Sequence, residues 1–163
     1  IRELGPLITA FIVVGRSGTA IATELGNMSV TREVVALRLM GIPISQFVIM
    51  PRIVGMVLSM LCLTFYFDVV AVFGGYLVAD AQLTIPFSAF VESVTRALST
   101  TDVLMTAIKG LGFGSAVAAV CCYHGLAVQS SYTEVPQQTT RAMINSFVLC
   151  LLVDVVVTVP LYL

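Results

Sequence analysis

The sequence predicts an all-α membrane protein, a polytopic helical bundle with four transmembrane helices in this portion of the chain. The prediction rests on four apolar stretches, which are Leu4–Thr23, Ile44–Ala79, Val103–Val128 and Ala142–Leu163. Each has about 20 residues or more, the length that a helix needs to cross a hydrocarbon core of ~30 Å. Only 10% of the residues are charged, whereas a soluble domain carries about 25%. We therefore treat residues 1–163 as one membrane domain.

Composition and motifs exclude several function classes. The net charge is −1 and no basic run occurs, so nothing indicates nucleic-acid binding. The chain has no G-x-x-x-x-G-K-[ST] motif and no arrangement of a nucleophile with a base, which argues against nucleotide binding and catalysis in this chain. All four cysteines lie inside apolar stretches without metal-ligand spacing, so we expect small buried hydrophobes and no metal site; they are Cys62, Cys121, Cys122 and Cys150.

The first connection, Glu24–Gly41, has the pattern of a short amphipathic helix. Val30, Val34 and Leu37 share one helical face, while Thr31, Arg32 and Arg38 fall largely away from it. Ser29 is the expected N-cap, and Gly41 with Pro43 marks the end. This pattern fits an ordinary interfacial helix or a docking helix for a soluble partner, and the residues alone do not separate the two.

The second stretch is longer than one crossing requires, and Pro43, Pro51 and Arg52 near its start predict an oblique course into the bilayer. The second connection, Asp80–Asp102, predicts a helix that has Pro86 in its first turn and lies on the membrane surface. Its apolar residues recur at helical spacing, and its polar residues lie on the other side. The apolar set is Phe87, Phe90, Val91, Val94 and Leu98; the polar set is Glu92, Ser93 and Arg96.

Glycines in the first and third stretches predict close helix packing, since a missing side chain lets backbones approach. The candidates are Gly15, Gly18, Gly110 and Gly114. The third connection, Gln129–Thr140, is expected to be a simple loop, with Thr139 or Thr140 capping the last helix.

Basic residues predict the orientation in the membrane. Arg32, Arg38 and Arg52 lie in or beside the first connection, whereas Arg96 is the lone basic residue of the second. By the positive-inside rule the first and third connections face the cytoplasm, and the second faces outside together with Leu163.

Charged residues inside the stretches are functional candidates, because a charge in lipid is costly. Arg2 lies ~21 Å along the helix from Arg16, with Glu3 beside it; the pair either faces a protein interior or a wet cavity, or neutralises itself in a structural role. Lys109 is close enough to the outer surface to snorkel. Asp68 and Asp154 lie deeper, and their partners do not follow from the sequence. His124 is expected to be a satisfied histidine near the membrane interface and not a metal ligand.

A family resemblance emerges from these motifs. Collinear elements resemble MlaE-type permeases, the membrane subunits of ABC transporters that work with MCE proteins on lipids. They are Arg2-Glu3-Leu4-Gly5-Pro6, Gly15-Arg16-x-Gly18-x-Ala20, Glu24-Leu25-Gly26-x-Met28, Met40-Gly41-x-Pro43, Pro51-Arg52, Ile108-Lys109, Cys122-Tyr123-x-Gly125 and Thr139-Thr140-Arg141-Ala142. His124 and the segment Ser29–Glu33 depart from the family pattern.

The resemblance implies a permease subunit of an ATP-driven transporter that moves phospholipids between the bacterial inner membrane and an MCE-domain partner. It implies five spans in the full chain, with an N-terminal elbow helix and first span preceding this portion. Two copies would pair, and a separate ABC ATPase would bind ATP and Mg, so this chain would be neither an enzyme nor a cofactor protein. The implied lipid-pathway candidates are Arg2, Glu3, Lys109 and Asp154; the implied ATPase-docking candidates on the cytoplasmic coupling helix are Glu24, Arg32, Glu33 and Arg38.

Two other functions remain consistent with the residues. A secondary transporter or channel would use Asp68, Asp154, Glu3 and Lys109 as an ion relay, but it assigns no role to the coupling-like helix. A purely structural membrane scaffold is the other alternative. Co-purification of an ATPase distinguishes the permease from both.

Overall fold

The computed structural model describes residues 3–83, 87–97, 100–128 and 131–162, and every regular element among them is helical. Four helical segments are long and apolar enough to cross a membrane, which confirms the predicted all-α polytopic fold. They are Leu4–Val30, Ser45–Asp80, Val103–Leu126 and Glu134–Val159. The expectations for Pro86 and Leu98 fall outside the described residues.

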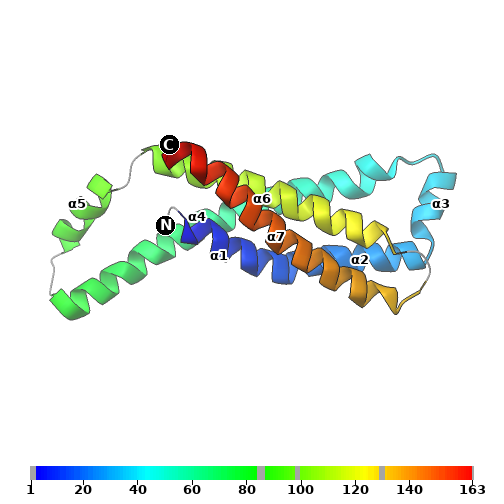
Figure 1. Ribbon diagram of the computed structural model, residues 1–163, viewed down its shortest axis with the longest axis horizontal. Helices are drawn as coiled ribbons and strands as arrows, with labels where there is room; N and C mark the ends of the chain where they lie inside the picture. The colour runs from blue at the N-terminus through cyan, green and yellow to red at the C-terminus, as the bar shows by residue number, and fades with distance from the viewer. Residues whose placement is uncertain (1–2, 84–86, 98–99, 129–130, 163) are drawn as a thin grey trace.

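The four spanning segments lie side by side as an elongated bundle (Figure 1). The short helix α3 (Glu33–Leu39) crosses one end of the bundle, and α5 (Phe87–Ala97) lies beyond the other. We call these the α3 end and the α5 end. The connection between α6 (Thr100–Leu126) and α7 (Glu134–Tyr162) is also at the α3 end, so the first and third connections share one side as the sequence predicts.

The first span is one continuous helix with a wide turn in the middle. It consists of α1 (Leu4–Val13), the π-helical turn η1 (Val14–Gly18) and α2 (Thr19–Val30). Because α2 runs on to Val30, the first part of the expected amphipathic segment belongs to the span, and α3 begins only after Arg32 turns the chain in the left-handed region at φ 60°.

Ser29 was expected to cap the coupling helix, and this prediction is wrong. Its hydroxyl lies inside the last turn of α2 and donates to the carbonyl oxygen of Val128 at 2.6 Å. Gly41 does end the α3 segment as predicted, with φ at +75°, a backbone conformation that favours glycine.

The second span begins with another π-helical turn, η2 (Ser45–Ile49), and continues as α4 (Met50–Leu83). Proline 51 accounts for the wide turn, since its ring clashes with the carbonyl four residues back, at Phe47, in an ordinary α-helix. At 34 residues, α4 is about 51 Å long and extends past the start of α6 toward α5 (Figure 1).

The last helix starts earlier than the sequence indicated. Residues expected to form a loop up to Thr140 are helical from Glu134 onward. Pro136 is compatible with this start, because the first turn of a helix needs no backbone donors. Glu134 also places a negative charge at the helix N-terminus, where it is favourable. Thr139 therefore lies within the helix, and its hydroxyl donates to the Val135 carbonyl.

Helix α6 is the centre of the bundle, because it packs against α4, α7 and α2. Phe113, Val117 and Ala118 of α6 are fully buried, with Met60 of α4 beside them in the main core. Large apolar side chains instead cover the outer faces of α4 and α7. This arrangement suits a helix bundle surrounded by lipid.

Glycines of α6 lie where neighbouring helices come closest. A Cβ added to Gly114 would be 2.9 Å from Cα of Val57 on α4, and one added to Gly110 would be 3.1 Å from the Leu61 side chain. Gly18 faces Cys121 of α6 at 3.1 Å. The Cβ position of Gly15 has no atom within 4 Å, so the described helices of this chain do not use Gly15 for packing.

We predict that Gly114→Ala destabilises the bundle by about 1–3 kcal/mol, because its methyl group would overlap the α4 backbone. The matched control is Gly15→Ala, which meets open space and should leave stability unchanged or slightly higher. The measurement is thermal exposure of buried thiols to a maleimide dye, with Cys121, Cys122 and Cys150 as reporters in a Cys62→Ser background. Equal melting temperatures for the two variants would contradict the packing assignment.

Candidate functional site

A buried polar cluster joins α6 and α7 toward the α5 end of the bundle. The Lys109 ammonium donates to Asp154 Oδ1 at 2.8 Å and to Thr158 Oγ1 at 2.8 Å. Glu3 Oε1, just before α1, lies 3.6 Å from the same nitrogen. Lys109 is 3% exposed and Asp154 is 8% exposed, so the pair is shielded by protein on almost every side. We call these four residues the lysine cluster.

The lysine cluster is built around one ammonium group. A lysine offers three N–H donors; two of them bind Asp154 and Thr158, and Glu3 adds an ion pair beyond hydrogen-bond distance. Asp154 is the strongest partner, because it is as close as Thr158 and also charged. The half-exposed Glu3 is farther away, which leaves its carboxylate the most available group of the cluster.

The expectation that Lys109 snorkels toward the surface is wrong, because its ammonium is held inside the bundle by α7. Asp154 and Lys109 are 45 residues apart, and their contact depends on how α6 and α7 pack. Thr158 was missed, although it follows Asp154 by four residues and so shares its helix face. Arg2, the remaining lipid-pathway candidate, lies outside the described residues.

Asp68 of α4 lies against the start of α1. Its Oδ1 atom is buried, has no hydrogen-bond partner among the described residues, and would be 2.6 Å from a Cβ on Gly5. Asp68 therefore makes no described contact with the lysine cluster. The ion-relay hypothesis needs Asp68 to connect with Asp154, Glu3 and Lys109, and the described hydrogen bonds do not make that connection.

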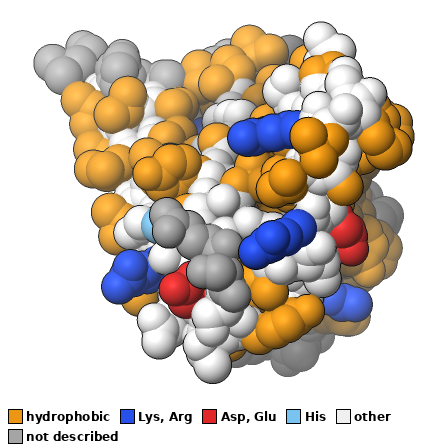
Figure 2. Space-filling model, turned by 90° about the vertical axis from the view of Figure 1, so that its right-hand side faces the viewer, with side chains coloured by type: hydrophobic (Ala, Val, Ile, Leu, Met, Phe, Trp, Pro, Cys, Tyr) orange, Lys and Arg blue, Asp and Glu red, His pale blue; other side chains and the backbone are white. Residues whose placement is uncertain are grey.

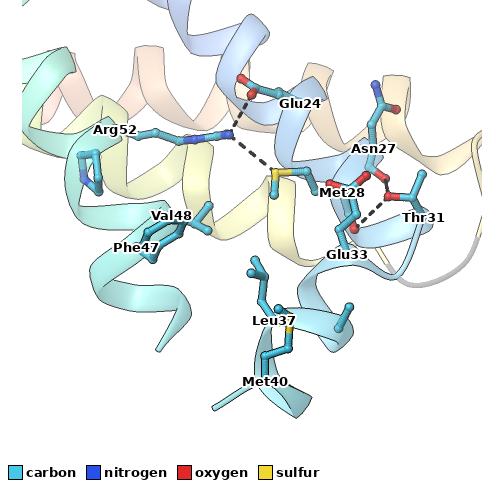
Figure 3. Close-up of a pocket in the computed structure, with 12 residues that line it drawn as sticks. Glu24, Asn27, Met28, Thr31, Glu33, Leu37, Met40, Phe47, Val48 and Arg52 are labelled. Carbon is cyan, nitrogen blue, oxygen red and sulfur yellow. Dashed lines mark hydrogen bonds and ion pairs between the residues drawn. The ribbon is translucent and has the colours of Figure 1, made fainter. Parts of the chain in front are cut away.

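The second candidate site is a cleft of about 780 Å³ at the α3 end, between α2, α3 and the start of the second span. Arg52 crosses this cleft: one terminal nitrogen donates to Glu24 Oε1 at 2.9 Å and contacts the Met28 sulfur at 3.6 Å (Figure 3). The other, Nη1, is buried without a described hydrogen-bond partner. The rest of the cleft lining is largely apolar and includes Leu37, Met40, Phe47 and Val48. We call this the coupling cleft.

The docking candidates are distributed around the coupling cleft. Glu24 and Glu33 line it, whereas Arg32, just before α3, and Arg38, in its last turn, are exposed. Leu39 is 84% exposed and Met40 is 67% exposed. Figure 2 shows this end of the molecule, where basic side chains are interspersed with apolar ones. The ion pair of Glu24 with Arg52 was missed by the sequence analysis, which assigned the two to different segments.

His124 has both ring nitrogens in hydrogen bonds, as expected of a satisfied histidine. Nδ1 lies 3.1 Å from Gln138 Oε1, and Nε2 lies 2.9 Å from the Asn145 amide nitrogen. These contacts join α6 to α7 near the α3 end. Within the described parts of the chain, no group of three or more metal-ligating side chains comes together.

Comparison with known proteins gives a consistent match. A family model described as Permease MlaE matches residues 1–160. A probable ABC transporter permease protein of Rickettsia typhi is 34% identical over 161 residues, which are 99% of this chain and 62% of that protein. The intermembrane phospholipid transport system permease protein MlaE of Haemophilus influenzae is 29% identical, with 99% of this chain and 62% of that protein covered.

A plant protein extends the range of relatives. The chloroplastic TRIGALACTOSYLDIACYLGLYCEROL 1 protein of Arabidopsis thaliana is 32% identical over 157 residues, or 96% of this chain and 45% of that protein. The chain therefore spans less than two thirds of the length of these relatives.

We predict that Lys109→Met destabilises the bundle by about 3–5 kcal/mol, because it leaves the buried Asp154 carboxylate without its counter-charge. The double variant Lys109→Met/Asp154→Leu should recover most of this loss, since no buried charge remains. Thermal thiol exposure in the Cys62→Ser background measures both. A double variant no more stable than the single one would show that the cluster is not held together by this pair.

Proposed function

Because the chain belongs to the MlaE permease family, we propose that it is the permease subunit of an ATP-driven ABC transporter that moves phospholipids. The observation that carries the proposal is the extent of the family match, which includes all four spanning segments and α3. The lipid would pass between the bacterial inner membrane and an MCE-domain protein outside it. The α3 end would face the cytoplasm, as the arginines of the first connection favour.

The proposed docking site for the ATPase is α3 with the rim of the coupling cleft. Exposed Leu39 and Met40 offer apolar anchors, and Arg32, Glu33 and Arg38 surround them with charges. An apolar centre with a charged rim is the usual anatomy of a protein interface. ATP and Mg²⁺ would bind the partner, so this chain would contribute no catalytic group.

Arg52 is the proposed mechanical link from the docking site to the membrane spans. It lies on the first turn of α4 and is tied to Glu24 on α2, so a displacement of α3 would press on both spans at their cytoplasmic ends. The wide turns η1 and η2 lie in these same two spans. π-helical turns are common at functional sites, and here they would let each span bend as the nucleotide state changes.

The lysine cluster is the proposed polar element of the lipid pathway. Its buried Lys109–Asp154 pair fixes α7 against α6, while half-exposed Glu3 presents a carboxylate at the edge of the cluster. A phospholipid headgroup passing this edge would compete for the third donor of Lys109. A second copy of the chain would pair with this one, as the family resemblance implies.

We predict that reversing the charges of Arg32, Glu33 and Arg38 together detaches the ATPase while membrane insertion stays intact. These side chains are exposed, so we expect the buried core to tolerate their reversal. The measurement is ATPase recovery after affinity purification of the full-length permease. The matched control exchanges Glu92 and Arg96 on α5, an exposed ion pair at the other end of the bundle. Normal ATPase recovery with the triple variant would contradict the docking assignment.

We also predict that Glu3→Gln changes lipid transport more than stability. Glu3 is the weakest-held partner of Lys109, so its removal should cost no more than about 1 kcal/mol. Lipid transfer by the full reconstituted complex and the melting temperature are measured on the same preparation. A loss of stability matching that of Lys109→Met, with transport otherwise normal, would assign Glu3 a structural role only.

The same preparation separates the permease from an ion-coupled transporter. Transport driven by an ion gradient without any ATPase subunit would contradict our proposal.

A further inference from the structure

A small apolar pocket lies between the far end of α4 and α5, away from both candidate sites. Its volume is about 200 Å³. Val72, Phe73 and Tyr76 form the α4 wall, and Phe90, Val91 and Val94 form the α5 wall. The rings of Tyr76 and Phe90 are in contact across the two walls, with centroids 5.3 Å apart. Thr95 also lines the pocket, but its hydroxyl donates to the Val91 carbonyl. We call this the α4–α5 pocket.

The two faces of α5 indicate how the pocket meets the membrane. Glu92 and Arg96 are exposed and paired at 2.6 Å on the side of α5 away from the pocket. An amphipathic helix of this kind lies in the membrane interface with its charges toward water and its apolar face toward the acyl chains. The pocket is on that apolar face, so it opens toward lipid.

Position along α4 agrees with this orientation. Val72 lies ~40 Å along the helix from Ser45 at 1.5 Å per residue, which exceeds a hydrocarbon core of ~30 Å. A tilt of about 40°, within the range of membrane helices, shortens this distance to ~31 Å along the bilayer normal. The pocket then lies at the outer boundary of the core, where the acyl chains of the outer leaflet begin.

From this geometry we propose that the α4–α5 pocket binds one acyl chain of a phospholipid in the leaflet on the α5 side. The proposal rests on the proposed lipid transport and adds a second lipid contact, distinct from the lysine cluster. There it would hold the tail of a lipid that is about to leave, or has just entered, the transporter.

The chemistry of the pocket favours an acyl chain over water or a polar ligand. An apolar cavity of about 150 Å³ stays free of water and takes up apolar ligands. The α4–α5 pocket is larger than that cavity. If it were empty, the side chains that line it would have no atoms opposite them with which to make dispersion contacts. An acyl chain is the flexible apolar ligand present at that depth, and it can enter past the exposed Phe73 and Val91 side chains.

Acyl-chain photocrosslinking tests the proposal on the full-length permease complex in lipid nanodiscs. A phosphatidylethanolamine with a diazirine in one acyl chain is activated by light without ATP, and adducts are mapped by mass spectrometry. We expect adducts concentrated on residues 72–76 and 90–95, above those on the lipid-facing α7 residues Val155 and Val156.

Two variants fill the pocket from opposite walls: Val72→Trp and Val94→Trp. Each should lower pocket adducts about tenfold, which corresponds to ~1.4 kcal/mol of lost binding. The matched control is Val78→Trp, since Val78 is on α4 and 60% exposed but does not line the pocket; its adducts should be unchanged. The melting temperature of each variant verifies folding.

The outcomes separate this inference from the proposed function. If adducts on the pocket do not exceed those on α7, or if neither filling variant lowers them, the pocket does not bind an acyl chain. ATP-driven lipid transfer, measured in parallel, would then still support the transporter. Conversely, pocket adducts in a complex without ATP-driven transfer would uphold the pocket and overturn the proposed function.

Discussion

Close backbone approach to α6 is the constraint on which the rest of the structure depends. Lipid tails are as apolar as leucine, so helices in a membrane gain little from burying apolar side chains and are held by packing and polar contacts. Gly110 and Gly114 bring α4 against α6, and Gly112 brings Val153 of α7 to within 3.3 Å of its Cβ position. At the α3 end, a Cβ on Gly125 would be 2.7 Å from Leu25 of α2. Small residues thus place three helices around one.

The lysine cluster gives that packing a defined register. An ammonium group inside the bundle must find partners, because an unpaired buried charge costs several kcal/mol. Asp154 and Thr158 can meet Lys109 only if α7 has one rotation and one height relative to α6. A slide of α7 by one turn would move both partners ~5.4 Å away. Glycines permit close approach, and the ion pair determines which faces approach.

The two ends of the molecule present different chemistry to different surroundings. At the α3 end, exposed charges and apolar side chains surround a cleft crossed by the Glu24–Arg52 pair, where we propose that a protein partner docks. At the α5 end, the apolar pocket and the amphipathic α5 are suited to lipid. The lysine cluster lies between them, nearer the α5 end. This distribution agrees with the proposed docking of an ATPase at the α3 end and the proposed lipid contact at the α5 end.

The sequence by itself determined the four spans, the sides on which their connections lie and the family. These depend on hydropathy, on segment length and on local motifs such as Gly41 with Pro43, all of which act within a few turns of one helix. The start of the last helix was misjudged because Pro136 is a loop signal that the first turn of a helix tolerates equally well. Only the tertiary structure decided that Lys109 binds Asp154, that Arg52 binds Glu24 and that Gly15 faces no other described helix. The two ion pairs join residues that are 28 and 45 positions apart, and they depend on how each helix is rotated about its axis. A membrane helix is apolar on nearly all sides, so its own sequence does not determine that rotation.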